Sequence, residues 1–350
     1  MNPARNAYSQ LYITMPSVSI IIVNYNGEQL LEDCFRALAQ QTYEDTELIL
    51  VDNASTDNSV KIATRVAPEA KVVRSSRNIG FAAGCNLGFK QARGDYFATL
   101  NTDTRASRSW LEELVRTLQA HPDAGMCASK LLRADRPTLI DSAGICLSEA
   151  GVAWDRLGGA VDDGTTQAAE IFGACAGAAL YRREMIELLG GFDESFFIYW
   201  DDVDLAWRAQ WSGWKCFYAP GAEVLHAHSA TMKEGSPFKS YLLARNRIWT
   251  LAKNLPRHPY KWFLPIAMYD AAAVLYGLTI KRNTHMLRGR WDGLRTASRI
   301  RHTHWQDTQS IMRTTRWLKL LEPAEPPWRV ARHFQYLDHP ATSGRKASSA

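Results

Sequence analysis

Apolar runs alternate with amphipathic stretches along the first hundred residues of the chain. Four short apolar runs predict buried strands, and they lie at residues 18–23, 48–51, 71–73 and 96–100. Apolar residues recur at helical spacing between these runs, in stretches at residues 29–40, 59–66 and 84–92. Strands that alternate with helices form a parallel sheet covered on both faces. The pattern therefore predicts an α/β fold with a Rossmann-like, mostly parallel central sheet.

The pattern becomes less regular after Leu100. Another amphipathic helix is predicted over 110–118, whereas the mixed, glycine-rich residues 130–170 indicate loops and edge strands. Residues 171–180 are small and apolar, which is typical of backbone packed tightly near a ligand. From about Pro237 onward the pattern is helical. We therefore expect an N-terminal extension, a main domain, a helical C-terminal region and a disordered tail, bounded as 1–16, 17–236, 237–335 and 336–350.

The net charge of +5 is concentrated in the C-terminal region, where residues 260–301 hold eight lysines and arginines but two aspartates. This local charge indicates a partner surface there and argues against a nucleic-acid-binding protein. The six cysteines are widely spaced without a Cys-x-x-Cys pair, and the first 16 residues lack the apolar core of a signal peptide. Reduced thiols and a cytoplasmic location are expected.

Polar residues follow two of the predicted strands. Asp52 ends the second run, and Asn101-Thr102-Asp103 ends the fourth. Carboxylates at such strand ends face the crevice where open sheets bind ligands, and one or two can hold Mg²⁺ or Mn²⁺ together with phosphates and water. For Asp52, spacing slightly favours a helix cap over contact with a nucleobase or ribose. The small residues of 77–84 fit either amides that approach a phosphate or an ordinary turn into a helix.

The densest acidic cluster is Asp201, Asp202 and Asp204, which follows several aromatic residues and opens a helical stretch. A helix start favours ionised carboxylates, whereas crowding beside apolar rings raises the pKa of at least one. That balance suits a general base. Downstream, His226 and His228 follow another apolar run and are candidates for a metal site.

Taken in order, six segments resemble the family 2 glycosyltransferases with a GT-A fold, and within them the rhamnosyltransferase-like branch. The segments are VSIIIVNYNG (18–27), LILVDNASTDNS (48–59), RNIGFAAGCNLG (77–88), YFATLNTD (96–103), GGFDESFFIYWDDVDLAWR (190–208) and HAHSAT (226–231). The stretch YLLARNRIWTLAKNLP (241–256) is also similar to this branch. The resemblance implies a GT-A domain over 17–236 followed by a helical extension.

The resemblance also implies roles for individual residues. The nucleotide-binding residues would be Val23, Tyr25, Asp52, Asn78, Gly80 and Asn101. Asp103 would be the main ligand of Mn²⁺ or Mg²⁺, with His226 beside the metal or the diphosphate. Asp202 would be the catalytic base, preceded by Asp201 where the family has Glu. Asn101 replaces the first acid of the family's Asp-x-Asp motif, so the metal is expected to bind weakly until the donor diphosphate arrives.

The expected reaction is an inverting sugar transfer from a nucleotide-diphosphate donor, with dTDP-rhamnose as the expectation for this branch. The acceptor would be a hydroxyl of a glycan or lipid-linked glycan in cell-surface polysaccharide synthesis. One alternative is a sugar-nucleotide pyrophosphorylase, although the first strand lacks the glycine-rich phosphate loop of that class. The other is a non-catalytic nucleotide- or carbohydrate-binding module, which would not need Asp103, Asp202 and His226 together.

Residues 262–280 are apolar and almost long enough to span a membrane. Asp270 near the middle and Pro265 near the start disfavour a span. Two interpretations remain open. A helix at the membrane interface would meet anionic lipid through its basic neighbours and place the protein at the inner face of the cytoplasmic membrane. A packed helical subdomain or dimer interface would instead favour a homo-oligomer.

Overall fold

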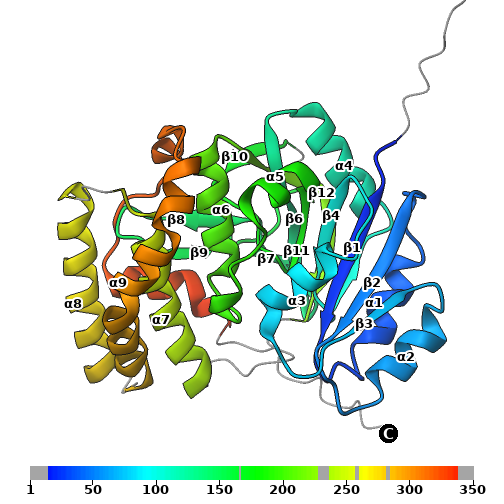
Figure 1. The fold of residues 1–350 in the computed structure, drawn as a ribbon, viewed down its shortest axis with the longest axis horizontal. Helices are drawn as coiled ribbons and strands as arrows, with labels where there is room; N and C mark the ends of the chain where they lie inside the picture. Colours follow the sequence, from blue (N-terminus) through cyan, green and yellow to red (C-terminus); the bar gives the residue numbers. More distant parts are fainter. Residues whose placement is uncertain (1–14, 165–166, 228–235, 257–259, 281–283, 338–350) are drawn as a thin grey trace, which may run out of the picture.

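The computed structural model describes residues 15–164, 167–227, 236–256, 260–280 and 284–337. His228 and most of the predicted N-terminal extension and tail lie outside these ranges. The described chain forms one large mixed sheet flanked by helices, with three C-terminal helices on one side (Figure 1). The α/β fold with helices on both faces, predicted from the apolar pattern, is confirmed.

Four parallel strands form one half of the sheet, in the spatial order β3-β2-β1-β4. Their bounds are β1 Val18–Asn24, β2 Thr46–Asp52, β3 Lys71–Arg74 and β4 Tyr96–Leu100. Successive side chains of a strand point to opposite faces, and in β1 both faces are apolar. Val18, Ile20 and Ile22 join the hydrophobic cluster of one face, whereas Ile21 joins that of the other. Burial on both faces explains why these strands are continuous apolar runs.

Helices cover both faces of the sheet. One face carries α1 (Leu31–Leu38), α2 (Ser59–Val66) and α4 (Trp110–Ala120). The other carries α3 (Gly80–Phe89), α5 (Arg183–Leu189) and α6 (Asp201–Ser212), with a short 3₁₀ helix at Glu194–Phe196. Helix α3 begins at Gly80, four residues before the predicted start at Gly84.

The second half of the sheet is less local in sequence, and here the prediction of loops and edge strands over 130–170 is only partly right. Strand β6 (Ala124–Arg133) is buried along its whole length, and β11 (Ala178–Arg182) lies between β4 and β6, antiparallel to both. Strand β12 (Lys215–His226) pairs parallel with β6. The remaining strands are β5 (Thr104–Ala106), β7 (Arg136–Ser142), β10 (Ala169–Ile171) and the separate hairpin β8 (Ile145–Leu147) and β9 (Ala153–Asp155).

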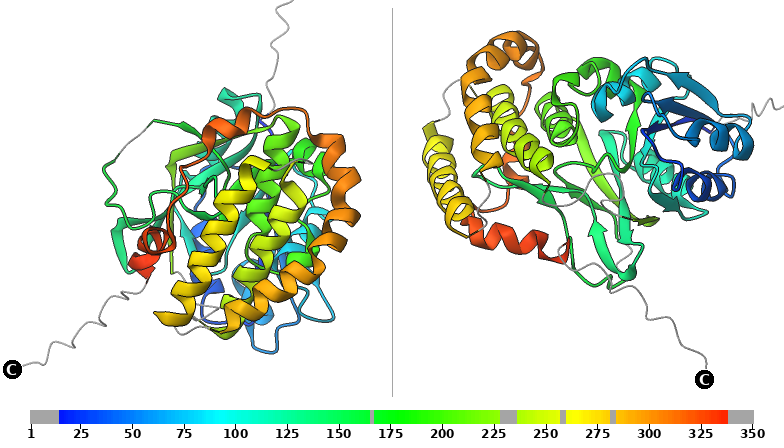
Figure 2. Two further views of the ribbon diagram at one scale, coloured as in Figure 1. Left: turned by 90° about the vertical axis from the view of Figure 1, so that its left-hand side faces the viewer. Right: turned by 90° about the horizontal axis from the view of Figure 1, so that it is seen from below.

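The C-terminal region consists of α7 (Pro237–Asn254), α8 (Tyr260–Thr279) and α9 (His285–Ile311), which lie side by side in Figure 2. Glycines allow α7 and α9 to approach closely: a Cβ on Gly289 would lie 2.2 Å from the carbonyl oxygen of Tyr241. A shorter segment follows, with 3₁₀ helices at Arg316–Leu320 and Ala331–Leu337 and α10 at Pro327–Val330. In α8, Ala273 and Gly277 are buried, while many of its large apolar side chains are exposed.

Candidate functional site

The carboxyl ends of β1 and β2 place Asn24 beside Asp52 in the sheet register. The Asp52 side chain is buried and accepts a hydrogen bond from the Ser55 amide at 3.3 Å. Asp57, not Asp52, accepts the amide of Ser59, the first residue of α2. The cap interpretation that spacing favoured for Asp52 is therefore wrong, and its nucleotide-binding role stays a prediction.

Val23 and Tyr25 flank the end of β1 and differ in exposure. A Cβ on Gly84 of α3 would lie 2.7 Å from Val23 Cγ1, so the Val23 side chain packs between the sheet and this helix. The nucleotide-binding role of Val23, which is only partly buried, stays a prediction. Tyr25 is 43% exposed, which leaves its ring accessible for stacking on a base.

The start of α3 uses its amides within the protein. The amide of Gly80 donates to Asn78 Oδ1, and the amide of Phe81 donates to the carbonyl oxygen of Phe197 at 2.6 Å. A Cβ on Gly80, whose φ is +86°, would lie 2.4 Å from the same carbonyl oxygen. These two amides bond within the turn and to the loop that precedes α6, as in the turn interpretation, and the nucleotide-binding roles of Asn78 and Gly80 stay predictions.

The predicted metal residues Asp103 and His226 lie together, and a third side chain joins them. His226 Nε2 lies 3.3 Å from Asp103 Oδ1, while His226 Nδ1 lies 2.6 Å from Asp141 Oδ2. All three side chains are largely buried. Pairing of β12 with β5 brings His226 opposite Thr104, the residue after Asp103, and Asp141 comes from β7.

The two carboxylates control the charge of His226. Burial alone would lower its pKa, but the hydrogen bonds and charges of Asp103 and Asp141 outweigh burial and raise the pKa to about 10. Asp141 on Nδ1 fixes the ring so that Nε2 faces Asp103, which is how a carboxylate orients a metal-binding histidine. The pair offers one carboxylate and one imidazole nitrogen. Among the described residues, no group of three or more His, Cys, Asp or Glu side chains could hold a metal, so the pair fits an ion completed by phosphate or water.

A cavity of about 540 Å³ lies between α6 and the C-terminal helices. Asn101, Asp201 and Asp202 line it, and so do Cys175, Ala176 and Gly177. The Asn101 amide donates to the Gly177 carbonyl at 2.8 Å, and the Ala176 amide donates to Asp202 Oδ2 at 3.3 Å. The small-residue segment therefore joins the end of β4 to the acidic pair. Asp103 and His226 do not line this cavity.

The two carboxylates of the pair differ in their surroundings. Burial, together with the charge of Asp202, raises the pKa of Asp201 far above its ordinary value, and Asp201 Oδ2 has no hydrogen-bond partner within the described ranges. Burial also raises the pKa of Asp202, but the amides of Ala176 and Val203 oppose this effect. Asp201 thus retains a proton more readily, whereas two backbone amides stabilise the anion of Asp202. Asp202 is therefore the stronger candidate for a base.

The loop before the pair has an unusual backbone. Phe197, Tyr199 and Trp200 all have φ between 67° and 69°, a region that L-residues with bulky side chains rarely adopt. Asn246 of α7 is completely buried, and its Nδ2 donates to the carbonyl oxygens of Phe196, Ile198 and Tyr199 at 2.8–3.1 Å. Such strain persists only where neighbouring contacts hold it. A residue of the C-terminal region therefore fixes the loop that positions Asp201 and Asp202.

Comparison with known proteins identifies the family. The model of the family described as "Glycosyl transferase family 2" matches residues 19–190. The chain belongs to glycosyltransferase family 2. This glycosyltransferase is 26% identical over 275 residues to the N-acetylglucosaminyl-diphospho-decaprenol L-rhamnosyltransferase of Mycobacterium tuberculosis, covering 71% of this chain and 87% of that protein.

One further relative and one similar solved structure are longer than this glycosyltransferase. It is 30% identical over 258 residues to the O-antigen biosynthesis protein RfbC of Myxococcus xanthus, which covers 69% of this chain but only 20% of that protein. Its fold resembles the crystal structure of GalNAc-T7 with UDP, GalNAc and Mn²⁺, with a TM-score of 0.60 at 14% identity over 86% of this chain and 59% of that one. The predicted GT-A fold is thereby confirmed.

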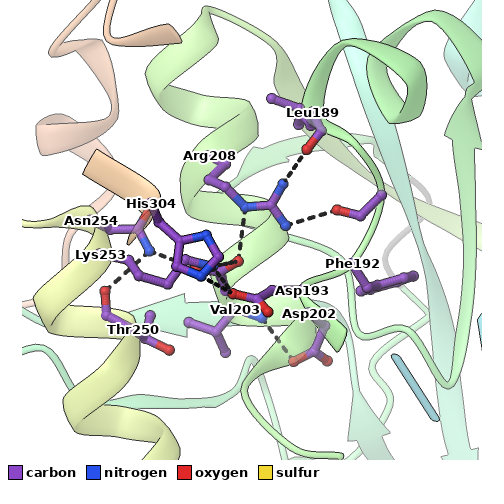
Figure 3. Close-up of polar contacts among 12 residues, drawn as sticks. Leu189, Phe192, Asp193, Asp202, Val203, Arg208, Thr250, Lys253, Asn254 and His304 are labelled. Carbon is purple, nitrogen blue, oxygen red and sulfur yellow. Dashed lines mark hydrogen bonds and ion pairs between the residues drawn. The ribbon is translucent and has the colours of Figure 1, made fainter. Parts of the chain in front are cut away.

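Asp204 of the acidic cluster has a structural role in this glycosyltransferase, and its partners Arg208, Lys253 and Asn254 are labelled in Figure 3. Its carboxylate accepts hydrogen bonds from Arg208 of α6 and from Lys253 and Asn254 of α7, at 2.8–2.9 Å. Lys253 also pairs with Asp193. Buried charges are stable only when paired in this way, so the network fastens α7 to α6.

Reasoning from the sequence missed two residues that shape the candidate site. Asp141 lies in the region interpreted as loops and edge strands, and Asn246 lies within a stretch noted only for its resemblance. Neither has a local signal, because each acts on residues 47 or more positions away in the chain. A buried carboxylate in a strand and a buried amide in a helix are the kinds of residue that require a distant polar partner.

Proposed function

We propose that this family 2 glycosyltransferase transfers a sugar from a nucleotide-diphosphate donor to a hydroxyl group of a glycan acceptor, with inversion at the anomeric carbon, in cell-surface polysaccharide synthesis. The observation that carries the proposal is the 175–177 segment, which bonds to Asn101 on one side and to Asp202 on the other. It joins the predicted donor-side strand end to a carboxylate in a cavity of suitable size for a sugar. Rhamnose from dTDP-rhamnose is the proposed donor, because the mycobacterial relative is an L-rhamnosyltransferase.

In the proposed reaction, Asp202 takes the proton of the acceptor hydroxyl as that oxygen forms a bond to the anomeric carbon. The bond from the anomeric carbon to the donor diphosphate breaks, and the nucleoside diphosphate leaves on the opposite side. Asp201, which retains a proton more readily, lets Asp202 remain the anionic member of the pair. Mn²⁺ or Mg²⁺ held by Asp103 and His226 would neutralise charge on the leaving diphosphate.

Substitution of Asp202 tests the proposal. Asp202→Asn keeps the shape but cannot accept the proton, so we expect transfer to fall by about 10²–10⁴-fold. Nucleotide binding should be retained, as measured by calorimetry with dTDP and Mn²⁺. Asp33→Asn, an exposed acid on α1, is the control and should leave transfer unchanged. Turnover of Asp202→Asn near that of the native protein would contradict the assignment, as would a metal titration that Asp103→Ala does not alter.

We also propose that α8 lies at a membrane interface at the inner face of the cytoplasmic membrane. Its length and composition alone would permit a membrane span. However, Asp270 near its middle pairs with Arg247 of α7 and Arg290 of α9, and a span would have to break these pairs. Tyr260, Phe263, Leu264 and Met268 are 64–79% exposed. An exposed apolar face beside basic residues fits shallow insertion among anionic lipids.

Vesicle sedimentation tests this placement. The full chain should sediment with vesicles that contain phosphatidylglycerol, more at low than at high salt, and not with pure phosphatidylcholine. A Phe263→Ser, Leu264→Ser double variant should lose this binding. Leu188→Ser, an exposed leucine on α5, is the matched control. Absence of vesicle binding, with dimerisation that the double variant disrupts, would contradict the proposal and assign the face to a homo-oligomer.

A further inference from the structure

The cavity beside Asp202 has a second wall that lies outside the region matched by the family model, which ends at residue 190. Helices α7, α8 and α9 supply this wall, with Leu243 and Arg247 from α7, Tyr269 from α8, and Met286 and Arg290 from α9. A ligand that reaches Asp202 within this cavity therefore also meets the C-terminal helices.

Two arginines of this wall share one carboxylate. Asp270 Oδ1 lies 2.7 Å from Arg247 Nη1 and 3.3 Å from Arg290 Nε. Two guanidinium groups against one carboxylate leave a positive charge on the wall. Burial lowers the pKa of Arg290, and although Asp270 opposes this, the neighbouring Arg247 charge adds to it. An anion bound beside both arginines would relieve this repulsion.

Arg247 is held rigidly, whereas Arg290 keeps donors for a ligand. Arg247 Nε and Nη2 donate to the carbonyl oxygens of Gly151 and Ala150 at 2.9 and 2.8 Å, and its side chain is 6% exposed. Within the part of the chain that the structure describes, Arg290 donates one hydrogen bond, from Nε to Asp270. Its two terminal nitrogens can thus present a planar fork, the geometry that matches phosphate oxygens.

The charges also give a ligand one orientation. Asp202, the anionic member of the pair, would repel an anionic group, which is therefore stabilised at the arginine wall, while a hydroxyl is suited to the carboxylates. Aromatic side chains, including Trp154, Tyr199 and Trp200, line the cavity as well, and such rings suit the apolar faces of a sugar.

We propose that Arg247 and Arg290 bind a phosphate or diphosphate group of the acceptor, so that the acceptor is a phosphorylated sugar whose hydroxyl meets Asp202. This inference rests on the proposed function, since it assigns the acceptor subsite of the same cavity. The same phosphate chemistry is present in a lipid diphosphate sugar and in a soluble sugar phosphate. The mycobacterial relative is an N-acetylglucosaminyl-diphospho-decaprenol L-rhamnosyltransferase.

Calorimetry on the full chain tests the subsite with three probes: N-acetylglucosamine 1-phosphate, an N-acetylglucosaminyl diphosphate ester of a short isoprenol, and the uncharged octyl N-acetylglucosaminide. We expect both phosphorylated probes, or the lipid one alone, to bind roughly tenfold or more tighter than the uncharged glycoside. Tighter binding of both phosphorylated probes would indicate a soluble or lipid-linked acceptor. Tighter binding of the lipid probe alone would indicate a lipid-linked acceptor. Arg290→Gln should abolish the preference, and Arg290→Lys should restore part of it.

Arg288→Gln, an exposed arginine on the same helix, is the matched control and should keep the preference. Binding of dTDP with Mn²⁺, measured in parallel, separates this inference from the proposed function. Equal affinity for charged and uncharged probes would overturn the inference, as would an Arg290→Gln variant that weakens dTDP binding but not probe binding. Loss of transfer in Asp202→Asn with an intact phosphate preference would support both proposals.

Discussion

His226 Nδ1 lies 2.6 Å from Asp141 Oδ2, and this contact directs the opposite ring nitrogen, Nε2, toward Asp103. Three strands meet in this contact, since His226 ends β12, Asp141 belongs to β7 and Asp103 precedes β5. The position of the imidazole thus depends on a second carboxylate, which contacts the ring nitrogen opposite the one that faces Asp103. A change at Asp141 should therefore affect metal binding without removing a ligand.

Asp141→Asn should weaken Mn²⁺ binding by about 10–100-fold, the usual effect of removing a carboxylate that orients a metal-binding histidine. Mn²⁺ titration of nucleotide binding measures the change. Asp45→Asn, at an exposed acid between α1 and β2, should have no effect. Unchanged Mn²⁺ affinity in Asp141→Asn would show that Asp141 does not orient His226 for a metal.

Mn²⁺ affinity should rise with pH. The pKa of His226 is raised to about 10, so the ring is protonated at neutral pH, and a metal must displace the Nε2 proton. Below that pKa, affinity should increase by about tenfold per pH unit, with uptake of Mn²⁺ releasing one proton. Calorimetry in buffers of different ionisation enthalpy measures the proton. A pH-independent affinity between pH 6 and 8 would contradict His226 as a ligand.

Asn246→Leu should impair turnover more than donor binding. The variant leaves the carbonyl oxygens of Phe196, Ile198 and Tyr199 without the donor they share, at a cost of about 1–3 kcal/mol in the free energy of unfolding. The positive-φ loop can then relax and displace Asp201 and Asp202. We expect a lower kcat with an unchanged donor KM. Gln40→Leu, at an exposed amide on the other side of the sheet, is the control. Full activity of Asn246→Leu would mean that the loop holds its conformation alone.

Lys253→Met should destabilise the fold by about 3–5 kcal/mol at pH 7, because Asp193 and Asp204 would be left buried without their lysine. Burial opposes ionisation of both carboxyls, yet Lys253 holds both pKa values below the ordinary 3.8. A lowered pKa contributes stability above pH 3.8, and this contribution is lost as the pH falls through the folded-state pKa.

The difference in stability between the native protein and Lys253→Met should therefore be largest at neutral pH and decrease in acid. Urea unfolding at pH 7 and at about pH 2.5, which is below the ordinary pKa of 3.8, measures it. The control Lys90→Met, at an exposed lysine, should change the unfolding free energy by less than about 0.5 kcal/mol. A difference that grows on acidification would contradict this account of the network.

Local patterns in the sequence predicted the parallel half of the sheet because each of its strands is buried on both faces. Ile20, Ile21 and Ile22 form such a run, and only a strand between two helical layers suits it. The position of β11 between β4 and β6 could not be predicted in this way, since pairing of Leu180 with Ala98 depends on contacts far apart in the chain.

Residues of the candidate site that lie in the family's ordered motifs were predicted. Roles that depend on packing between distant segments of the chain were missed. The resemblance brought Asp103, His226 and Asp202 into one prediction, and the structure places the first two in contact. Asp204 belonged to the same acidic cluster, yet its partner Lys253 lies 49 residues away and gives it a structural role. The sequence around Asp202 and Asp204 cannot show which of the two has a structural role. That role follows from the bonds that Asp204 makes to α7.

The amide of Asn246 and the ammonium of Lys253 set a lower limit on the length of chain that can fold into an active enzyme. A chain ending at Ser236, before α7, would leave Asp204 as a buried carboxylate paired with Arg208 alone and the loop of Phe197 without its donor. Homologous sequences trimmed to the 19–190 match would lack α6 itself, together with Asp201 and Asp202. Chimeras that exchange donor specificity between relatives should therefore exchange all residues up to Asn254 as one segment.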